Sequence, residues 1–236
     1  TVASLFRTAL EAVPAGLKLR VREVVSAAPA GPALLGWYVR SSRERSIYDS
    51  ADAFLVSFPK CGRTWLKLML GRALITHFGL EGVGPLNLAR ISRLAGRVPH
   101  MRAIHDDFPQ WKSPGQLTRS REHFRGKQVI LLVRDIRDVV VSNYFQKTRR
   151  NKGYRGDLSS FLRHPIGSVD TLIAYYNIWA ENRHVPAGFL LVRYEDLHRD
   201  AHGELRRVLA FLGVQDVPEA VIDDAVRYTS FDNMRR

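Results

Sequence analysis

Hydrophobic residues along the chain fall into two kinds of run: short continuous ones and longer ones with helical spacing. The short runs, rich in aromatic and β-branched residues, predict three clear strands and one weak strand: Ala53–Phe58, Val129–Val133, Phe189–Val192, and Ala103 with Ile104. Helical spacing predicts five helices: Thr64–Phe78, Asp138–Phe145, Val169–Arg183, Ala201–Leu212 and Pro218–Tyr228. Continuous apolar strands are typical of parallel sheets covered on both faces. The pattern therefore predicts an α/β fold with a central, mainly parallel β-sheet flanked by helices.

Residues 1–50 differ from the rest of the chain, because loosely helical leucines are interspersed there with basic residues. We interpret this segment as an N-terminal arm packed on a main domain of residues 51–236. The alternative is a basic amphipathic segment that contacts a membrane or a partner. No run reaches the roughly 18 apolar residues that span a bilayer. We expect a cytoplasmic protein, with peripheral membrane contact as an alternative. The sequence does not begin with Met, so removal of a leader stays open.

Charge adds a second kind of information. The chain has 236 residues, with 36 Lys+Arg against 23 Asp+Glu and a formal net charge of +13. Of the basic residues, 29 are arginine, whose planar fork suits phosphate or sulfate. An anionic ligand, a nucleic acid and an acidic membrane surface are therefore all candidate partners. The single cysteine, Cys61, excludes an internal disulfide and a multi-cysteine zinc site, and no other cluster with metal-ligand spacing occurs.

The segment after the first predicted strand has the features of an anion site. Residues Ser57–Trp65 read SFPKCGRTW, so a turn with glycine leads into a helix that begins near Thr64. The free N–H groups and the dipole at a helix start favour a negatively charged ligand, and Lys60 adds a mobile positive charge. The Walker pattern G-x-x-x-x-G-K-[ST] does not occur in the chain, which disfavours a nucleotide triphosphate kinase.

Residues Pro59–Trp65 also resemble the 5′-phosphosulfate loop of the sulfotransferases, Pro-Lys-x-Gly-x-Thr-Trp. These enzymes transfer a sulfuryl group from 3′-phosphoadenosine-5′-phosphosulfate (PAPS) to an acceptor. Arg134 at a strand end, with Ser142 eight residues later, is similar to the family's 3′-phosphate motif. Tyr-Glu-Asp-Leu from Tyr194 and Thr-Ser-Phe from Thr229 are similar to its adenine segments. The resemblance covers roughly residues 53–234 and implies a P-loop-NTPase-like sulfotransferase fold.

The resemblance assigns roles to particular residues. It implies the following PAPS-binding set: Lys60, Cys61, Gly62, Arg63, Thr64, Trp65, Arg134, Ser142, Tyr194, Thr229 and Phe231. Arg134 and Ser142 would hold the 3′-phosphate, and the aromatic side chains with Thr229 would hold adenine. Core packing is the ordinary alternative for aromatic residues in such positions.

The family places its catalytic histidine after the second strand, where this chain has His105 followed by two aspartates. An imidazole with a pKa near 6.5 is suited to remove a hydroxyl proton. We expect in-line displacement with three catalytic residues: His105 as the base, Lys60 neutralising charge on the departing phosphate, and Ser142 aligning the donor. No metal is required. Asp106 is a candidate to orient His105.

Several positions depart from the family pattern. Cys61 stands where common members have Ser, Arg63 where they have Thr, and Ala103 where many have Lys, for which Arg102 is a candidate substitute. The closing Arg-Lys-Gly segment, which grips the 3′-phosphate in the family, does not occur before Arg236. We interpret this difference as a disordered tail that the sequence omits rather than as a different grip on the cofactor.

The sequence thus predicts a PAPS-dependent sulfotransferase that acts on a hydroxyl of a small-molecule, glycan or lipid acceptor and leaves adenosine 3′,5′-bisphosphate (PAP). One alternative is a nucleotide-dependent kinase of similar topology. The other is a basic nucleic-acid-binding module, although no signature of one occurs and no nucleic acid is expected. We expect residues 1–50, 79–100 and 146–167 to line the acceptor pocket, because loops dominate there. Acceptor identity and oligomeric state stay open.

Overall fold

Four strands form one parallel sheet at the centre of the fold. The computed structural model describes residues 47–150 and 154–230. The strands are β1 (Ala53–Ser57), β2 (Met101–Ile104), β3 (Gln128–Val133) and β4 (Gly188–Arg193), in the order β2-β1-β3-β4. β1 pairs in parallel with both β2 and β3, and β3 pairs in parallel with β4. The predicted α/β class with a parallel sheet is confirmed.

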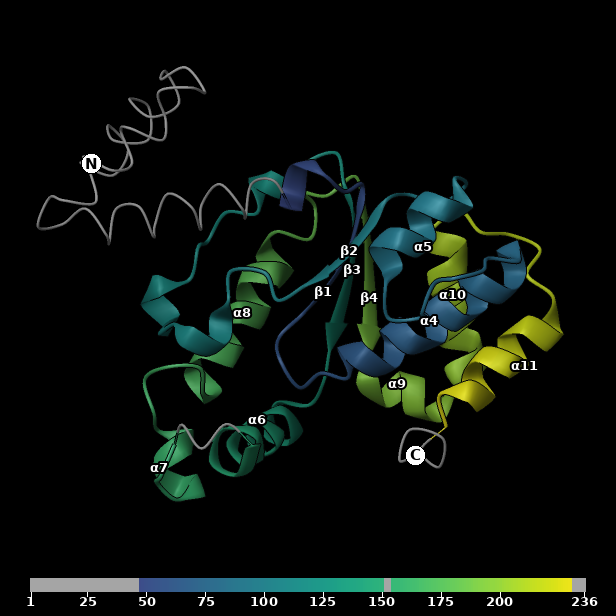
Figure 1. Cartoon of the computed structure of the whole chain (residues 1–236). Helices are drawn as coiled ribbons and strands as arrows, with labels where there is room; N and C mark the ends of the chain where they lie inside the picture. The colour runs from purple at the N-terminus through teal and green to yellow at the C-terminus, as the bar shows by residue number, and fades with distance from the viewer. Residues whose placement is uncertain (1–46, 151–153, 231–236) are drawn as a thin grey trace, which may run out of the picture. The chain divides into compact units, whose positions relative to one another are not determined.

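Burial explains why the central strands read as continuous apolar runs. Every residue of β1 is buried, and so are the four apolar residues Val129–Leu132 of β3. Helices flank both faces of the sheet, so neither face alternates with solvent (Figure 1). β4 lies at an edge of the sheet, and only Val192 in it is buried. The hydrophobic core therefore surrounds β1 and β3.

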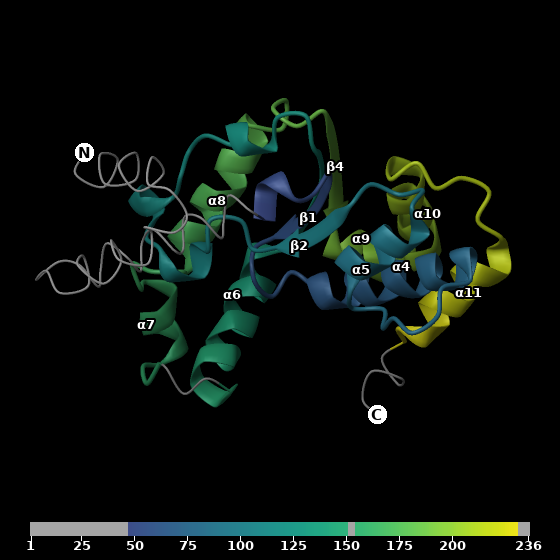
Figure 2. The ribbon, with the colours of Figure 1, turned by 45° about the horizontal axis from the view of Figure 1, so that its top comes forward.

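Two groups of helices cover the sheet (Figures 1 and 2). One side carries α6 (Ile136–Phe145), α7 (Leu158–Leu162) and α8 (Val169–Glu181). The other side carries α4 (Arg63–Phe78), α5 (Leu88–Ala95), α9 (Tyr194–Arg199), α10 (Ala201–Phe211) and α11 (Glu219–Tyr228). Three 3₁₀ turns lie between β2 and β3: η1 (Pro109–Trp111), η2 (Pro114–Gln116) and η3 (Glu122–Phe124). A π-helical turn, η4 (Gln146–Arg150), follows α6.

The observed helices differ from the predicted ones in several places, and capping side chains account for two of the differences. Helix α6 begins two residues earlier than predicted, because the Asp135 carboxylate accepts a hydrogen bond of 2.9 Å from the Arg137 N–H. Helix α8 ends at Glu181 and not at Arg183. Helix α5 lies inside residues 79–100, where the sequence pattern predicted loops, so that part of the prediction is wrong. Asn87 caps it by accepting 3.1 Å from the Arg90 N–H.

The predicted arm of residues 1–50 lies almost wholly outside the described residues, so the division into an arm and a main domain stays a prediction. The chain from Ala51 onward forms one compact unit. Across residues 47–150 and 154–230, no helix combines the length and the apolar character needed to cross a membrane.

Candidate active site

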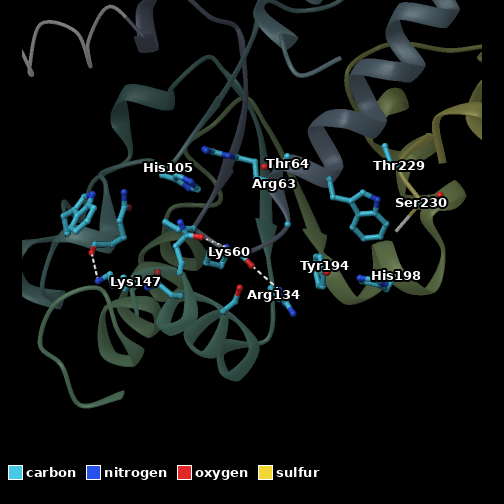
Figure 3. Close-up of a pocket in the computed structure, with 18 of the residues that line it drawn as sticks. Lys60, Arg63, Thr64, His105, Arg134, Lys147, Tyr194, His198, Thr229 and Ser230 are labelled. Atoms are coloured by element: carbon cyan, nitrogen blue, oxygen red, sulfur yellow. Dashed lines mark hydrogen bonds between the residues drawn. The ribbon is translucent and has the colours of Figure 1, made fainter. Parts of the chain in front are cut away.

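The carboxyl ends of the four parallel strands meet at one edge of the sheet, and a predicted site residue follows each of them. Lys60 follows β1, His105 follows β2, Arg134 follows β3 and Tyr194 follows β4. The sheet order places β2 on one side of β1 and β3 on the other, which makes β1 the switch point where α/β sheets bind ligands. All four side chains line one cavity of about 810 Å³ (Figure 3).

The loop after β1 is shaped by two residues with left-handed backbone conformations, Lys60 at φ 75° and Gly62 at φ 90°. Gly62 is required for a second reason as well. A Cβ atom at this position would lie 2.6 Å from the Cε2 atom of the Tyr194 ring, which is inside van der Waals contact. The loop and the tyrosine after β4 can therefore approach each other only because residue 62 has no side chain.

Helix α4 begins at the cavity with unpaired backbone donors. Gly62 is its N-cap and supplies no side-chain acceptor, and no acidic residue lies in the first turn. The first N–H groups to donate within the helix are those of Trp65 and Leu66, both to the Gly62 carbonyl. Among the described residues, the N–H groups of Arg63 and Thr64 have no partner. This helix start presents free N–H donors at the position where the sequence predicts an anion site.

The Cys61 side chain lies behind the loop and outside the cavity lining. It is fully buried, and its Sγ lies 3.4 Å from the Tyr176 hydroxyl. Burial is the main cause that raises the pKa of the Cys61 thiol to about 12, so the group is a neutral thiol. Cys61 was assigned to the PAPS-binding set by resemblance. In this position only its backbone is available to a ligand.

Arg134 and Ser142 come together in the cavity, as the sequence predicted. The Arg134 guanidinium lies over the Tyr194 ring, 4.2 Å from its centroid, and Nη2 lies 3.1 Å from a carboxylate oxygen of Asp138. Nη1 donates 3.4 Å to the Lys60 carbonyl, which connects the loops after β1 and β3. Ser142 lines the same cavity from helix α6. The fork of Arg134 is thus held in place while its Nε has no hydrogen-bond partner.

Three aromatic rings line the cavity beside Arg134. The Trp65 ring lies 5.8 Å from that of Tyr194 and 4.7 Å from that of His198, and Tyr194 lies 4.7 Å from His198. Thr229 and Ser230 complete this end of the cavity (Figure 3). Sequence reasoning missed His198, although its place four residues after Tyr194 in a helix would put both on one face. Phe231, the other predicted adenine contact, lies outside the described residues.

His105 is held in one orientation by the backbone. Its Nδ1 lies 2.8 Å from the Ser57 carbonyl oxygen at the end of β1. Because a carbonyl oxygen only accepts, Nδ1 carries the proton and Nε2 presents a lone pair. Burial and the nearby Arg63 guanidinium lower the pKa of His105 to about 4, so the imidazole is neutral at physiological pH. The unprotonated Nε2 is the form that a proton acceptor needs, while the lowered pKa makes this ring a weaker base than an ordinary imidazole.

Asp106 does not orient His105, which corrects the suggestion made from the sequence. It turns into the protein instead: its carboxylate forms a buried ion pair with Arg121 at 2.9 Å and contacts His123 Nε2 at 3.2 Å. Arg121 is fully buried and also lies over the Trp179 ring. The backbone carbonyl of Ser57 has the orienting role that sequence reasoning gave to Asp106.

The cavity is rich in positive charge. Four cationic side chains line it, and no Asp or Glu is among its described lining residues; the four are Lys60, Arg63, Arg134 and Lys147. Lys60 donates 3.3 Å to Gln146, and its pKa is lowered by burial and by the charges of Arg150 and Arg134. The Arg63 pKa is also lowered by burial. Such a cavity is suited to a ligand with several negative charges.

The end of the cavity near His105 contains residues that sequence reasoning missed. Gln110 and Trp111 belong to the 3₁₀ turn η1, a few residues after His105, and line the cavity together with Lys147 from η4. Of the segments predicted for the acceptor pocket, 146–167 contributes Gln146 and Lys147. Within the described residues, 79–100 contributes none. No group of three or more His, Cys, Asp or Glu side chains suited to a metal ion occurs among the residues that the structure describes.

The chain matches a known protein family over most of its length. The sulfotransferase domain family matches residues 50–236. The chain belongs to the sulfotransferase family. Family membership supports the sulfotransferase interpretation over the kinase and nucleic-acid alternatives.

Similar sulfotransferases come from mammals and plants. Sulfotransferase 1A1 of Rattus norvegicus is 29% identical over 207 residues, which cover 78% of this chain and 67% of the relative. Sulfotransferase 2A6 of Mus musculus is 32% identical and covers 84% of this chain and 71% of the relative. The flavonol 4′-sulfotransferase of Flaveria chlorifolia is 25% identical and covers 78% and 63%. The chain therefore spans about two thirds of the length of these relatives.

Two crystal structures share the fold. Mouse sulfotransferase SULT7A1 complexed with PAP has a TM-score of 0.54 and 21% identity, covering 79% of this chain and 66% of the other. Retinol dehydratase in complex with androsterone and the inactive cofactor PAP has a TM-score of 0.53 and 17% identity, covering 78% and 66%. At these identities the likeness shows the P-loop-like α/β sulfotransferase fold and not the ligand of this chain.

Proposed function

We propose that the chain is a PAPS-dependent sulfotransferase that acts on a hydroxyl group. One observation carries the proposal. A single cavity combines a cationic cradle, with no Asp or Glu among its described lining residues, and a neutral histidine whose ring is oriented by a backbone carbonyl. Two proteins of the same fold have been crystallised with PAP, which supports a nucleotide donor with two phosphate sites. A small-molecule acceptor agrees with the family.

The donor fits the groups that have no protein partner. Nη1 of Arg63 and Nε of Arg134 are buried without hydrogen bonds, and the first N–H groups of α4 are unpaired. Lys60 and the start of α4 would hold the 5′-phosphosulfate, while Arg134 and Ser142 would hold the 3′-phosphate. Trp65 with Tyr194 and His198 would pack on adenine, because aromatic faces stack on bases.

His105 would act as the base at a defined atom. Its Nδ1–H donates to Ser57, so Nε2 is free to accept the proton of the acceptor hydroxyl. PAPS supplies the sulfuryl group: the acceptor oxygen forms the new bond to sulfur as the bond from sulfur to the 5′-phosphate oxygen breaks. Lys60 would stabilise the charge that grows on that phosphate oxygen, an interaction that strengthens as the charge develops.

The test begins with the donor site alone. Purified protein is titrated with PAP without metal, and separately with Mg-ATP, while thermal unfolding is followed. A ligand that binds only the folded state and is present at about 100 times its dissociation constant adds roughly 2.7 kcal/mol of stability. We expect stabilisation by PAP. Stabilisation by Mg-ATP alone would favour a kinase, and no response to PAP would refute a PAPS site in this chain.

The role of His105 needs a separate measurement. His105→Ala should reduce sulfuryl transfer by about 10²–10⁴-fold, the usual contribution of a general base. PAP affinity should change less than about two-fold, because His105 does not belong to the donor cradle. A variant that loses PAP binding together with activity would contradict the base assignment, since His105 would then be a structural part of the donor site.

A further inference from the structure

Lys147 lines the cavity toward the end where His105 lies. Figure 3 shows it toward the same end of the cavity as His105, with Lys60 between this end and Tyr194, Thr229 and Ser230. Lys147 is the second residue of η4, five residues after Ser142. The cavity therefore continues past the donor groups into a region with its own cation.

The charge of Lys147 is not neutralised by any carboxylate among the residues that the structure describes. Its Nζ donates only a long hydrogen bond of 3.5 Å to the Gln110 carbonyl and lies over the rings of Trp111 and Phe161, at 5.4 and 5.3 Å. No carboxylate of the described residues lies within ion-pair distance of it. The side chain is partly buried, and this burial lowers the lysine pKa. An ammonium group has three donors, so most of its hydrogen-bonding capacity is unused.

Trp111 provides an apolar surface beside this cation. It is 63% exposed although it is the largest side chain in η1, and it lines the cavity. A large aromatic side chain that faces a cavity without burial contributes little to the core, and an apolar ligand would cover it. Gln110, its neighbour, also lines the cavity and adds a neutral polar group.

On the proposed function, we infer that the acceptor is an anionic hydroxyl compound with an aromatic or other apolar body. Lys147 pairs with the anionic group, Trp111 packs on the apolar body, and the hydroxyl lies at His105 Nε2. This inference rests on the proposed transferase activity and deepens it, because it names the chemical class of the acceptor.

The donor does not account for Lys147. The 5′-phosphosulfate already has Lys60 and the start of α4, and the 3′-phosphate has Arg134 and Ser142. If Lys147 served the donor, its removal would weaken PAP binding. If it served only the fold, its removal would lower stability without changing any preference between ligands. The three roles therefore predict different measurements.

The experiment uses the whole chain saturated with PAP, whose binding is first confirmed by the thermal shift. Matched acids and methyl esters are then titrated by calorimetry: 3-(4-hydroxyphenyl)propanoate as the phenol and 12-hydroxydodecanoate as the aliphatic alcohol. In at least one pair we expect the acid to bind about ten-fold or more tightly than its ester, which corresponds to about 1.4 kcal/mol. The same preference should appear in KM when PAPS replaces PAP.

Three variants test the assignment. Lys147→Gln should bring acid and ester within about two-fold of each other with PAP affinity unchanged, whereas Lys147→Arg should keep the preference because it keeps the charge. Lys127→Gln is the matched control and should behave as wild type. It removes the same charge just before β3 begins, at the amino-terminal end of the strands and away from the carboxyl ends that form the cavity.

Some outcomes would overturn the inference. The first is equal or tighter binding of the ester in both pairs. The second is no binding of either acid up to about 10 mM, which corresponds to a binding free energy weaker than about 3 kcal/mol. The third is an acid preference that survives in Lys147→Gln. Loss of PAP binding in Lys147→Gln would assign the residue to the donor and also overturn it. Failure of the wild type to bind PAP would instead refute the proposed function on which the inference rests.

Discussion

The partly buried imidazole of His105 should make folding stability depend on pH in a defined window. Its pKa is lowered from 6.5 to about 4, first by burial and then by the charge of Arg63, with the Ser57 carbonyl opposing them. Between these two values the unfolded chain binds the proton and the folded protein does not. Stability is therefore unaffected by this group above pH 6.5 and falls as the pH drops from 6.5 toward 4.

The magnitude follows from the size of the pKa shift. One pKa unit corresponds to about 1.4 kcal/mol, and the shift from 6.5 to about 4 gives a limit of about 3.4 kcal/mol. Linkage over a single group gives a loss of about 3 kcal/mol between pH 7 and pH 4. That is a large part of the 5–15 kcal/mol typical of a domain.

The assay is urea unfolding at intervals from pH 4 to pH 8 for wild type and His105→Gln. Glutamine keeps a side-chain donor toward the Ser57 carbonyl but cannot take up a proton. The difference in unfolding free energy between the two proteins should shift by about 3 kcal/mol in favour of the variant as the pH falls from 7 to 4. His184→Gln, at an exposed position, is the control. A difference that stays constant across this range would refute the lowered pKa of the partly buried imidazole.

Three further predictions concern the cradle and its support. Gly62→Ala should weaken PAP binding by about ten-fold or more, because the new methyl group would clash with Tyr194. Gly79→Ala, at φ 61° with open space around it, should leave PAP binding unchanged and lower the unfolding free energy only by the roughly 1 kcal/mol of backbone strain. Arg134→Lys should remove most of the preference for PAP over adenosine 5′-phosphate in calorimetry, because lysine lacks the two-pronged geometry. Asp106→Ala leaves a buried arginine unpaired and should lower the unfolding free energy by about 3–5 kcal/mol in urea; a loss below about 1 kcal/mol would contradict the buried pair.

The fold was predictable where burial makes the sequence pattern simple. The central strands β1 and β3 are covered on both faces, so their apolar runs are continuous and their positions could be read directly. β2 is only partly buried after Met101, and its pattern is correspondingly weak. Helix α5 is short and depends on the Asn87 cap rather than on a long apolar period. The neighbours in the sheet follow from tertiary packing and could not be read from periodicity.

The site was predictable where a residue lies at, or within three residues of, the carboxyl end of a strand. Lys60, His105, Arg134 and Tyr194 occupy the same end of four parallel strands, so their meeting is a consequence of topology. Residues in irregular segments were not predictable in this way. Sequence reasoning paired Asp106 with its neighbour in the chain, although its actual partner, Arg121, lies fifteen residues later, beyond two 3₁₀ turns.

The concentration of positive charge in the cavity also explains why a polyanionic donor would bind well. The pKa of Lys60 is lowered by burial and then by two arginines, and no carboxylate is among the described lining residues; Asp138, which pairs with Arg134, lies outside the lining. The free protein therefore holds its cations at a cost in electrostatic energy, and a ligand with several negative charges removes that cost when it binds. A carboxylate in the wall would make the free protein more stable but would compete with the donor for the same cations. The absence of acidic side chains from the described wall is therefore better explained by ligand binding than by folding.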